Sequence, residues 1–385
     1  MSSIDTAKAT QKPRIALVLQ GGGALGAYHI GVYQAMAEAG LHPDWIAGIS
    51  IGALTAAVLA GNRPEERVTQ LEAFWDDITL PDEWGSVFVG GERKLFNFMS
   101  NLRTTFFGQP NFWYNRLLNP AVLPYVDPDG ASYCDTSPMR ETLRRRVNFD
   151  LLNTKAVRLS VGVTNVSTGH LHFFDNTTQP ADKPMTPEHI LASGSLPPGF
   201  PPTRVEGQLY WDGGCASNSP GEVIFQERDP AKRPQLLILV DLYTAEGREP
   251  TNMNEVTQRM TQIQYVDRAL NHLRHEASSH NLRTHLLQAR ARSVDPAVAQ
   301  AIAQQHVAAG MHIVHLVYHP LPDQLANSEA EFSRPSITER RAEGYQKMRS
   351  ILAAPPWQEA VWQDHPDEII IHHARKGQMV SKRYF

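Results

Sequence analysis

The first 245 residues alternate between short apolar runs and turns rich in glycine or polar residues. Arg14–Leu19 is apolar at every position after Arg14, which is typical of a parallel strand buried on both faces. A glycine-rich turn follows, and a helical pattern then continues to about Ala39 and ends at Gly40. A second apolar run covers Trp45–Ile49. Strand, turn, helix and strand make a βαβ unit, so we expect an α/β protein with a mostly parallel sheet.

The same patterns assign most of the remaining chain. Amphipathic spacing and N-terminal proline or serine signals predict helices at Pro64–Ile78, from Ser137, at Thr186–Ser193, at Asn254–Ala289 as one helix or two, at Pro296–Ala309 and at Pro335–Leu352. Apolar or alternating runs predict strands at Val157–Val163, His170–Phe174, Leu209–Trp211, Gln235–Tyr243 and Met311–Tyr318. The first two of these strands are expected to form a hairpin. The tail from Pro355 has no pattern that we can interpret.

Residues 80–125 differ from the rest of the chain. They contain ten aromatic residues of the chain's 7 Trp, 11 Tyr and 14 Phe, set among Gly, Pro and Asn. Two interpretations stay open: a lid or channel insert that surrounds an apolar substrate, or a satellite core packed on the main domain.

Composition narrows the range of functions. A net charge of −4 gives no reason to expect nucleic-acid binding. Cys134 and Cys215 are the only cysteines, which fits a reducing compartment, and the N-terminus lacks the apolar core of a signal peptide. No run approaches the roughly 20 apolar residues of a spanning helix. We therefore expect a cytoplasmic protein with a disordered leader at residues 1–13, and only peripheral contact with a membrane or granule surface.

The turn after the second strand carries the most specific candidate chemistry. Gly48-Ile49-Ser50-Ile51-Gly52 follows an apolar run and precedes a run of small residues. Two glycines flanking a serine between a strand and a helix predict a nucleophile elbow, in which a strained turn exposes the Ser50 hydroxyl above the sheet. A serine in this position can attack a carbonyl.

The glycine-rich turn after the first strand has two functional interpretations. Gly21, Gly23 and Gly26 match the spacing of a dinucleotide-binding fingerprint, but the acidic residue expected at the end of the second strand is missing, since Asp44 precedes that strand. The alternative is an oxyanion hole, a turn whose backbone N–H groups face a developing negative charge at a helix N-terminus.

Two further polar features are weaker. Asp212 ends a short strand and precedes two glycines, and taken alone it is an ordinary turn residue. His170 and His172 alternate along a strand and share one face, but no further metal ligand with a recognisable spacing lies near them. We therefore expect neither a metal site nor a cofactor.

Taken together, these motifs resemble the patatin-like phospholipase family over roughly Arg14–Tyr243. The resemblance rests on Gly21-Gly22-Gly23-Ala24-Leu25-Gly26, Gly48-Ile49-Ser50-Ile51-Gly52, Phe200-Pro201-Pro202, and Asp212-Gly213-Gly214 with Asn218 and Pro220. It implies a three-layer α/β sandwich with a catalytic domain at 14–245, followed by a mainly helical C-terminal extension at 246–385.

The resemblance also implies a Ser–Asp dyad, with Ser50 as nucleophile and Asp212 as base, and an oxyanion hole at Gly21, Gly22, Gly23 and Ala24. An aspartate with an ordinary pKa is a weak base towards a serine hydroxyl, so the dyad predicts a buried, desolvated Asp212. Many family members carry Arg or Lys where this chain has Leu25. That difference removes a charge from the loop and leaves its backbone donors.

The resemblance implies a serine acyl hydrolase that cleaves lipid esters through an acyl-enzyme intermediate. Because the C-terminal part looks like an extension found on one bacterial branch, a short-chain polyester such as polyhydroxybutyrate is an alternative substrate. A classical triad would need a histidine after the acid, and His272 and His275 are eligible. A non-catalytic lipid-binding scaffold and an acyltransferase also stay open, and the sequence does not indicate an oligomeric state.

Overall fold

The computed structural model describes residues 13–80, 104, 108–117, 120–122, 125–217, 220–227, 229, 231–247, 249–292, 310–320, 328–375 and 378–385. The expected leader, the expected helix at Pro296–Ala309 and most of the aromatic-rich segment lie outside these residues, as does Asn218.

A ten-stranded sheet runs through the described part of the chain in the order β12-β11-β10-β9-β1-β2-β5-β8-β7, with β6 also paired to β5. Its strands are β1 (Ile15–Leu19), β2 (Trp45–Ile49), β5 (Arg158–Asn165), β6 (Leu171–Asp175), β7 (Thr203–Val205), β8 (Gln208–Asp212), β9 (Leu236–Asp241), β10 (Met311–Val317), β11 (Ile369–Arg375) and β12 (Gln378–Arg383). The six strands from β11 to β5 along this order are parallel to one another, and those at the margins are antiparallel. A separate small hairpin pairs β3 (Tyr114–Asn115) with β4 (Cys134–Asp135).

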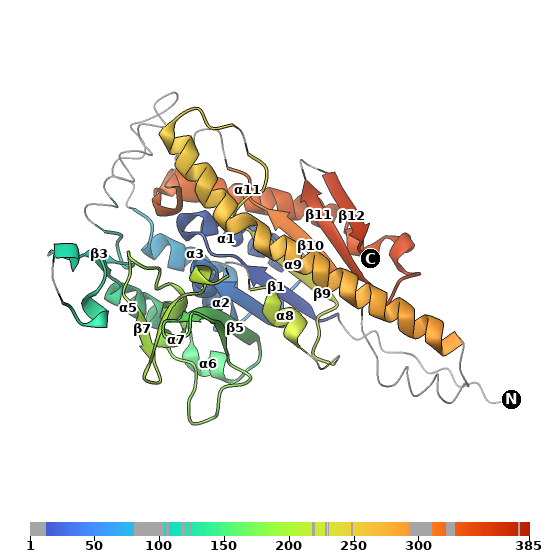
Figure 1. Ribbon diagram of the computed structural model, residues 1–385, viewed down its shortest axis with the longest axis horizontal. Helices are drawn as coiled ribbons and strands as arrows, with labels where there is room; N and C mark the ends of the chain where they lie inside the picture. Colours follow the sequence, from blue (N-terminus) through green and yellow to red (C-terminus); the bar gives the residue numbers. More distant parts are fainter. Residues whose placement is uncertain are drawn as a thin grey trace.

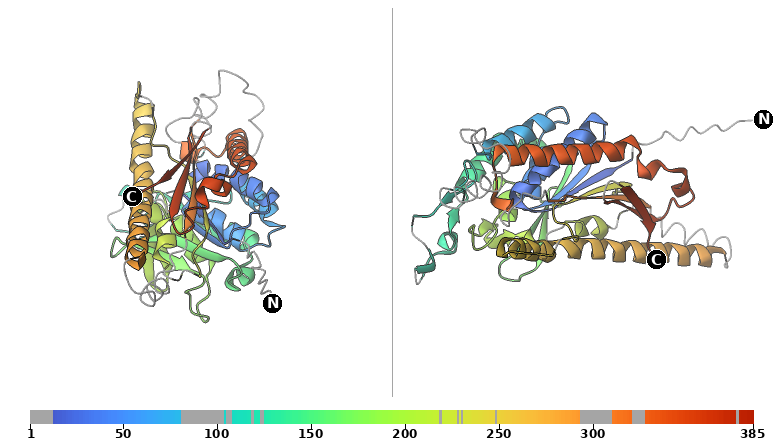
Figure 2. Two further views of the ribbon diagram at one scale, coloured as in Figure 1. Left: turned by 90° about the vertical axis from the view of Figure 1, so that its right-hand side faces the viewer. Right: turned by 90° about the horizontal axis from the view of Figure 1, so that it is seen from above.

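Helices cover both faces of the sheet, which confirms the expected three-layer α/β fold (Figures 1 and 2). The described helices are α1 (Ala27–Glu38), α2 (Ile51–Ala60), α3 (Arg67–Asp77), α5 (Ser137–Arg146), α6 (Phe149–Asn153), α7 (Pro187–Ser193), α8 (Glu222–Gln226), α9 (Met253–Arg292) and α11 (Arg334–Ala353). In Figure 2, α9 lies along one face of the sheet while α1 and α11 lie along the other.

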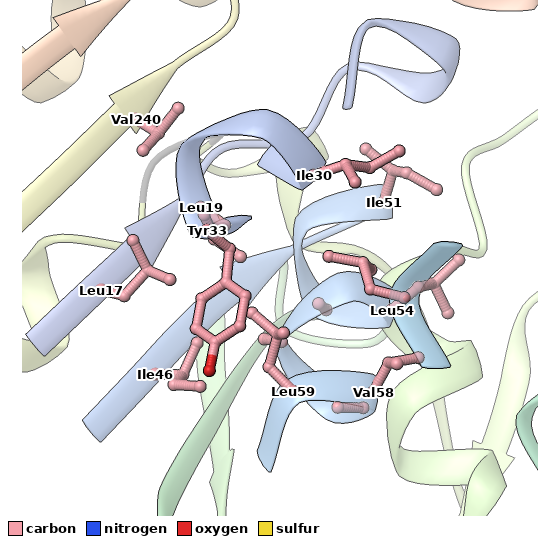
Figure 3. Close-up of a cluster of buried hydrophobic side chains, with 14 of the residues drawn as sticks. Leu17, Leu19, Ile30, Tyr33, Ile46, Ile51, Leu54, Val58, Leu59 and Val240 are labelled. Carbon is pink, nitrogen blue, oxygen red and sulfur yellow. The ribbon is translucent and has the colours of Figure 1, made fainter. Parts of the chain in front are cut away.

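The side chains of β1 explain why helices cover both faces of the sheet. Ile15, Leu17 and Leu19 belong to the larger apolar core, on the side of α1, α2, α3 and α11. Ala16 and Val18 point the other way, into a smaller core that includes residues of α8 and α9. Figure 3 shows part of the larger core, where side chains of α1 and α2 meet those of β1 and β2. An uninterrupted apolar run is therefore needed, because both faces of the strand are buried.

The C-terminal region departs from the expected mainly helical extension in one respect. It contains the long helices α9 and α11, and it also adds β10, β11 and β12 to the central sheet next to β9. The uninterpreted tail supplies two of these strands. Residue 245 is therefore not a boundary between separate cores, because the sheet continues across it.

Helices α1 and α11 approach each other closely enough that only glycine fits at two positions. A Cβ on Gly31 would lie 1.9 Å from the backbone oxygen of Arg341, and one on Gly344 would lie 2.2 Å from that of Tyr28. The C-terminal helix is thereby packed against the helix that follows the glycine-rich turn.

Among the described helices, none combines the length and the apolar character needed to cross a bilayer.

Candidate active site

Ser50 occupies the sharp turn between β2 and α2. Its backbone angles are φ 55° and ψ −130°, in a region that residues with a side chain rarely adopt. A Cβ on Gly48 would lie 2.3 Å from the Gly52 oxygen, and one on Gly52 would lie 2.2 Å from the Leu19 oxygen. Both positions require glycine, because α2 packs directly against the carboxyl ends of β1 and β2.

A short segment at the end of α7 holds both candidate catalytic residues. The Ser193 Oγ accepts a hydrogen bond from the Ser50 N–H at 2.9 Å and donates one to the Gly162 carbonyl at 2.6 Å. Two residues later, the Ser195 carbonyl accepts a hydrogen bond from the Asp212 N–H at 2.9 Å. Residues 193–195 therefore fix the backbone of Ser50 relative to that of Asp212.

Asp212 lies at the end of β8 with only 1% of its surface exposed. Its Oδ1 accepts a hydrogen bond from the Gly214 N–H at 2.8 Å, while its buried Oδ2 has no hydrogen-bond partner of normal geometry among the described residues. Burial raises the pKa of this carboxyl from 3.8 to about 7, and the Ser50 hydroxyl and the Gly214 N–H oppose the shift. At neutral pH this acid is poised to accept a proton.

The glycine-rich loop after β1 presents unused backbone donors next to Ser50. The N–H groups of Gly22, Gly23 and Ala24 have no hydrogen-bond acceptor among the described residues. Gly23 has φ +53°, and a Cβ there would lie 2.3 Å from the Glu329 oxygen. Gly21, Gly22 and Gly23 line the same cavity as Ser50, and Ala24, which follows Gly23 in the short helix η1 (Gly23–Gly26), is not among the described lining residues.

A cavity of about 370 Å³ brings these groups together. It is lined by the loop glycines, by Ser50 and Asp212, by aromatic side chains and by C-terminal residues; the described lining residues are Gly21, Gly22, Gly23, Ser50, Ile51, Leu54, Phe112, Trp113, Gly194, Leu196, Phe200, Asp212, Gly214, Tyr243, Thr261, Gln264, Tyr265, Glu329, Ala330 and Phe332. Its walls are mostly apolar.

Other candidates from the sequence lie elsewhere. His272 and His275 are on α9 and do not belong to the described lining of the cavity, and His172 packs against the rings of Phe174 and Tyr210. The described residues contain no group of three or more His, Cys, Asp or Glu side chains arranged to hold a metal ion. Of the aromatic-rich segment, Phe112 and Trp113 are described at the cavity, where their rings contact those of Phe200 and Phe332.

Sequence reasoning missed several residues that shape the site. Gln20 is fully buried, and its side chain accepts a hydrogen bond from the Leu242 N–H and donates one to the Tyr265 carbonyl at 3.1 Å. It therefore anchors the start of the glycine-rich loop to β9 and α9. Gln20 and Ser193 adjoin recognisable motifs but carry no signal of their own, since both contacts are distant in sequence.

Two family models match the chain. One, described as patatin-like phospholipase, matches residues 17–224, and the other, described as patatin phospholipase, matches residues 263–364.

Curated relatives match over short stretches. Neuropathy target esterase sws of Drosophila melanogaster is 49% identical over 61 residues, 16% of this chain and 4% of that protein. Triacylglycerol lipase SDP1L of Arabidopsis thaliana is 36% identical over 82 residues, 21% of this chain and 10% of that protein. The chain thus spans a small part of these relatives.

Solved structures match over longer stretches at low identity. VipD from Legionella pneumophila is 15% identical with a TM-score of 0.39, covering 89% of this chain and 67% of that one. Human GIVD cytosolic phospholipase A2 is 13% identical with a TM-score of 0.31, covering 60% and 40%.

The raised pKa of Asp212 predicts a stability cost that depends on pH. The folded protein keeps a proton that the unfolded chain releases between pH 3.8 and about 7, so stability falls as pH rises through this window. Asp212→Asn should therefore be more stable than the wild type at pH 8, by on the order of 2–4 kcal/mol, and nearly equal to it at pH 4. Urea unfolding at both pH values measures this. The exposed Asp150→Asn should show no such dependence; equal pH profiles for wild type and Asp212→Asn would contradict the argument.

Proposed function

Because the chain belongs to the patatin-like phospholipase family, we propose that it is a carboxylic ester hydrolase that uses a Ser50–Asp212 dyad. The observation that carries the proposal is the strained Ser50 beside a buried Asp212 of raised pKa, in one cavity with unused backbone N–H groups.

The chemistry follows from the positions of these groups. Asp212 Oδ2 takes the Ser50 hydroxyl proton while Ser50 Oγ bonds to the ester carbonyl carbon, and the carbonyl oxygen becomes an oxyanion. The N–H groups of Gly22, Gly23 and Ala24 are the proposed donors to that oxyanion; the N–H of Ile51, at the start of α2, is a further candidate donor from the elbow itself. Collapse of the intermediate expels the alcohol, which takes the proton from Asp212. Water activated by Asp212 then releases the acid.

The lining of the cavity favours an ester substrate whose acyl group is apolar. Phe112, Trp113, Phe200 and Phe332 form an aromatic wall that suits an alkyl chain. A lipid ester is therefore the proposed substrate, and a short-chain polyester is the second candidate because the same wall also accommodates short apolar segments.

The charge of the cavity favours a neutral ester. The described lining residues include two carboxyl groups, Asp212 and Glu329, and no lysine, arginine or histidine. Burial raises the pKa of Glu329, and a backbone hydrogen bond, the charge of Arg340 outside the described lining and a hydrogen bond with Tyr243 oppose that shift. A phosphate group brought into the cavity would meet these acids without a neutralising cation from the described lining.

Helix α9 supplies a surface for peripheral contact with a lipid layer. Met253, Val256, Met260 and Ile263 are 75%, 41%, 61% and 58% exposed, and their spacing places them on one side of the helix. Thr261 and Tyr265 of the same turns line the cavity. An apolar stripe beside the cavity suits the surface of a lipid layer, from which a substrate chain can enter.

Both cysteines are unpaired, in keeping with the cytoplasmic location that we propose.

The dyad predicts how hydrolysis responds to substitution. With p-nitrophenyl esters from butyrate to palmitate, Ser50→Ala and Asp212→Asn should lose at least about 1,000-fold in kcat, and His275→Ala should retain full turnover. Wild-type kcat/KM, whose pH profile reports the free enzyme, should rise as pH increases through about 7, since Asp212 acts in its ionised form. Two measurements distinguish a lipid substrate from a polyester substrate: the optimum of acyl-chain length, and the release of acid from polyhydroxybutyrate granules. Full activity in Asp212→Asn would rule out the dyad, and an inert wild type would favour the scaffold.

The acidic cavity predicts discrimination between substrates that differ only in a phosphate. The wild type should prefer a monoacylglycerol over the lysophosphatidic acid with the same acyl chain, both below their aggregation concentrations. Glu329→Gln should raise kcat/KM for the anionic substrate by roughly 10-fold where Glu329 is ionised, and change it little for the neutral one, because one repulsive charge is removed. Since burial raises the pKa of Glu329, this effect should grow as pH rises. Glu141→Gln, an exposed acid on α5, is the control. An unchanged ratio in Glu329→Gln would exclude this source of selectivity.

The apolar stripe predicts a defect confined to lipid layers. The double variant Met260→Gln, Ile263→Gln should bind phosphatidylcholine vesicles at least about 10-fold more weakly, since two apolar side chains lose their burial, while hydrolysing a soluble ester at the wild-type rate. Leu282→Gln with Leu286→Gln is the matched control, because these residues are also exposed on α9 but lie farther from the cavity. Equal losses of vesicle affinity in both double variants, or no loss in either, would argue against a role of the apolar stripe in lipid binding. Vesicle sedimentation gives the affinity.

A further inference from the structure

A buried arginine from the C-terminal region contacts the loop that carries the candidate oxyanion donors. Arg340, on α11, is 1% exposed. Its Nη1 donates to the Ala24 carbonyl at 3.1 Å and to the Glu331 carbonyl at 2.9 Å, and its Nη2 donates to the Ser328 carbonyl at 3.1 Å. The Glu331 carboxylate lies 3.8 Å from the guanidinium. Arg340 thus joins residues that are more than 300 positions apart in the chain.

The three carbonyls place this contact directly behind the cavity. Ser328 and Glu331 bracket the short helix η6 (Ser328–Ala330), in which Glu329 and Ala330 line the cavity. The Glu329 backbone packs closely on Gly23, because a Cβ on Gly23 would lie 2.3 Å from the Glu329 backbone oxygen. Ala24 follows Gly23. One guanidinium therefore holds the loop and the cavity wall that packs on it.

The chemistry of the contact bears on the oxyanion. An arginine presents several donors in a rigid plane, so its bond to the Ala24 carbonyl restricts the Ala24–Leu25 peptide unit. The N–H of that unit donates to the Gly22 carbonyl at 3.1 Å, and this carbonyl shares a peptide unit with the Gly23 N–H, a candidate oxyanion donor. Oxyanion donors must already be oriented before the reaction, because reorientation during the reaction costs free energy. The buried positive charge also bonds the loop from outside the described lining of the cavity, and it favours negative charge at the N–H groups.

We propose that Arg340 is a positioning residue for the oxyanion loop, so that the C-terminal region sets the rate of the chemical step and does not merely cover the fold. The proposal rests on the proposed serine hydrolase function. It assigns to Arg340 an effect on the transition state and only a small effect on substrate binding.

The test compares Arg340→Met and Arg340→Lys with the control Arg341→Met in the full-length protein. Arg341 is the next residue on α11, and its guanidinium bonds side chains of Gln34 and Glu72 without contacting the loop. Each variant is assayed for kcat and KM with p-nitrophenyl butyrate, and for inhibition by an alkylboronic acid, whose tetrahedral adduct with Ser50 mimics the oxyanion. Circular dichroism and urea unfolding establish that the variants are folded.

Arg340→Met should lose roughly 10- to 100-fold in kcat with KM within about threefold, because donor orientation acts mainly in the transition state. Its boronate inhibition constant should rise in parallel. Arg340→Lys, which keeps the charge with fewer fixed donors, should lose roughly 3- to 10-fold. Arg341→Met should match the wild type.

Wild-type kcat in folded Arg340→Met, or a rise in KM with unchanged boronate affinity, would overturn the positioning role. If Arg340→Met does not fold, Arg340→Lys decides, and wild-type kcat in that variant overturns the proposal. The wild type and Ser50→Ala test the proposed function separately: if the wild type is active and Ser50→Ala is not, the hydrolase function stands whatever the result for Arg340.

Discussion

The direct packing of α2 on the carboxyl ends of β1 and β2 is the constraint on which the candidate site depends. Gly48 and Gly52 permit it, because any Cβ would enter the space of a backbone oxygen. The turn that results can be made only with Ser50 in a left-handed conformation. The surroundings must then hold that strain, and the hydrogen bond between the Ser50 N–H and Ser193 does so from a different strand–helix unit. The proposed nucleophile is thus fixed by packing before any substrate arrives.

At Asp212, the pKa that the proposed base needs conflicts with the stability of the fold. A base that accepts a serine proton needs a pKa near neutrality, and burial supplies it at the expense of folding stability. Two hydrogen bonds limit that cost, one from the Ser50 hydroxyl and one from the Gly214 N–H to Oδ1 at 2.8 Å. Oδ2 is left for the proposed proton transfer. Stability and chemistry therefore compete at one carboxyl group.

The sequence predicted the first half of this arrangement well, because its signals are local. The apolar run of β1 and the glycines around Ser50 each reflect a constraint within a few residues. Contacts between distant segments left no such trace: Ser193 and Gln20 act through single hydrogen bonds to residues far along the chain. The tail was harder still, since β11 contains the adjacent histidines His372 and His373, whose polarity breaks the apolar run of a buried strand.

The position of the C-terminal elements explains why the cavity cannot be assigned to the N-terminal part alone. Strand β10 covers the edge of β9, the strand that leads into Tyr243 at the cavity. Helix α9 contributes Tyr265 and Gln264 to the lining, and the segment before α11 contributes Glu329 and Phe332. A chain ending near residue 245 would expose the edge of β9 and lose one wall of the cavity. The family match to residues 17–224 thus covers the proposed reacting groups, while the enclosure that surrounds them needs the rest of the chain.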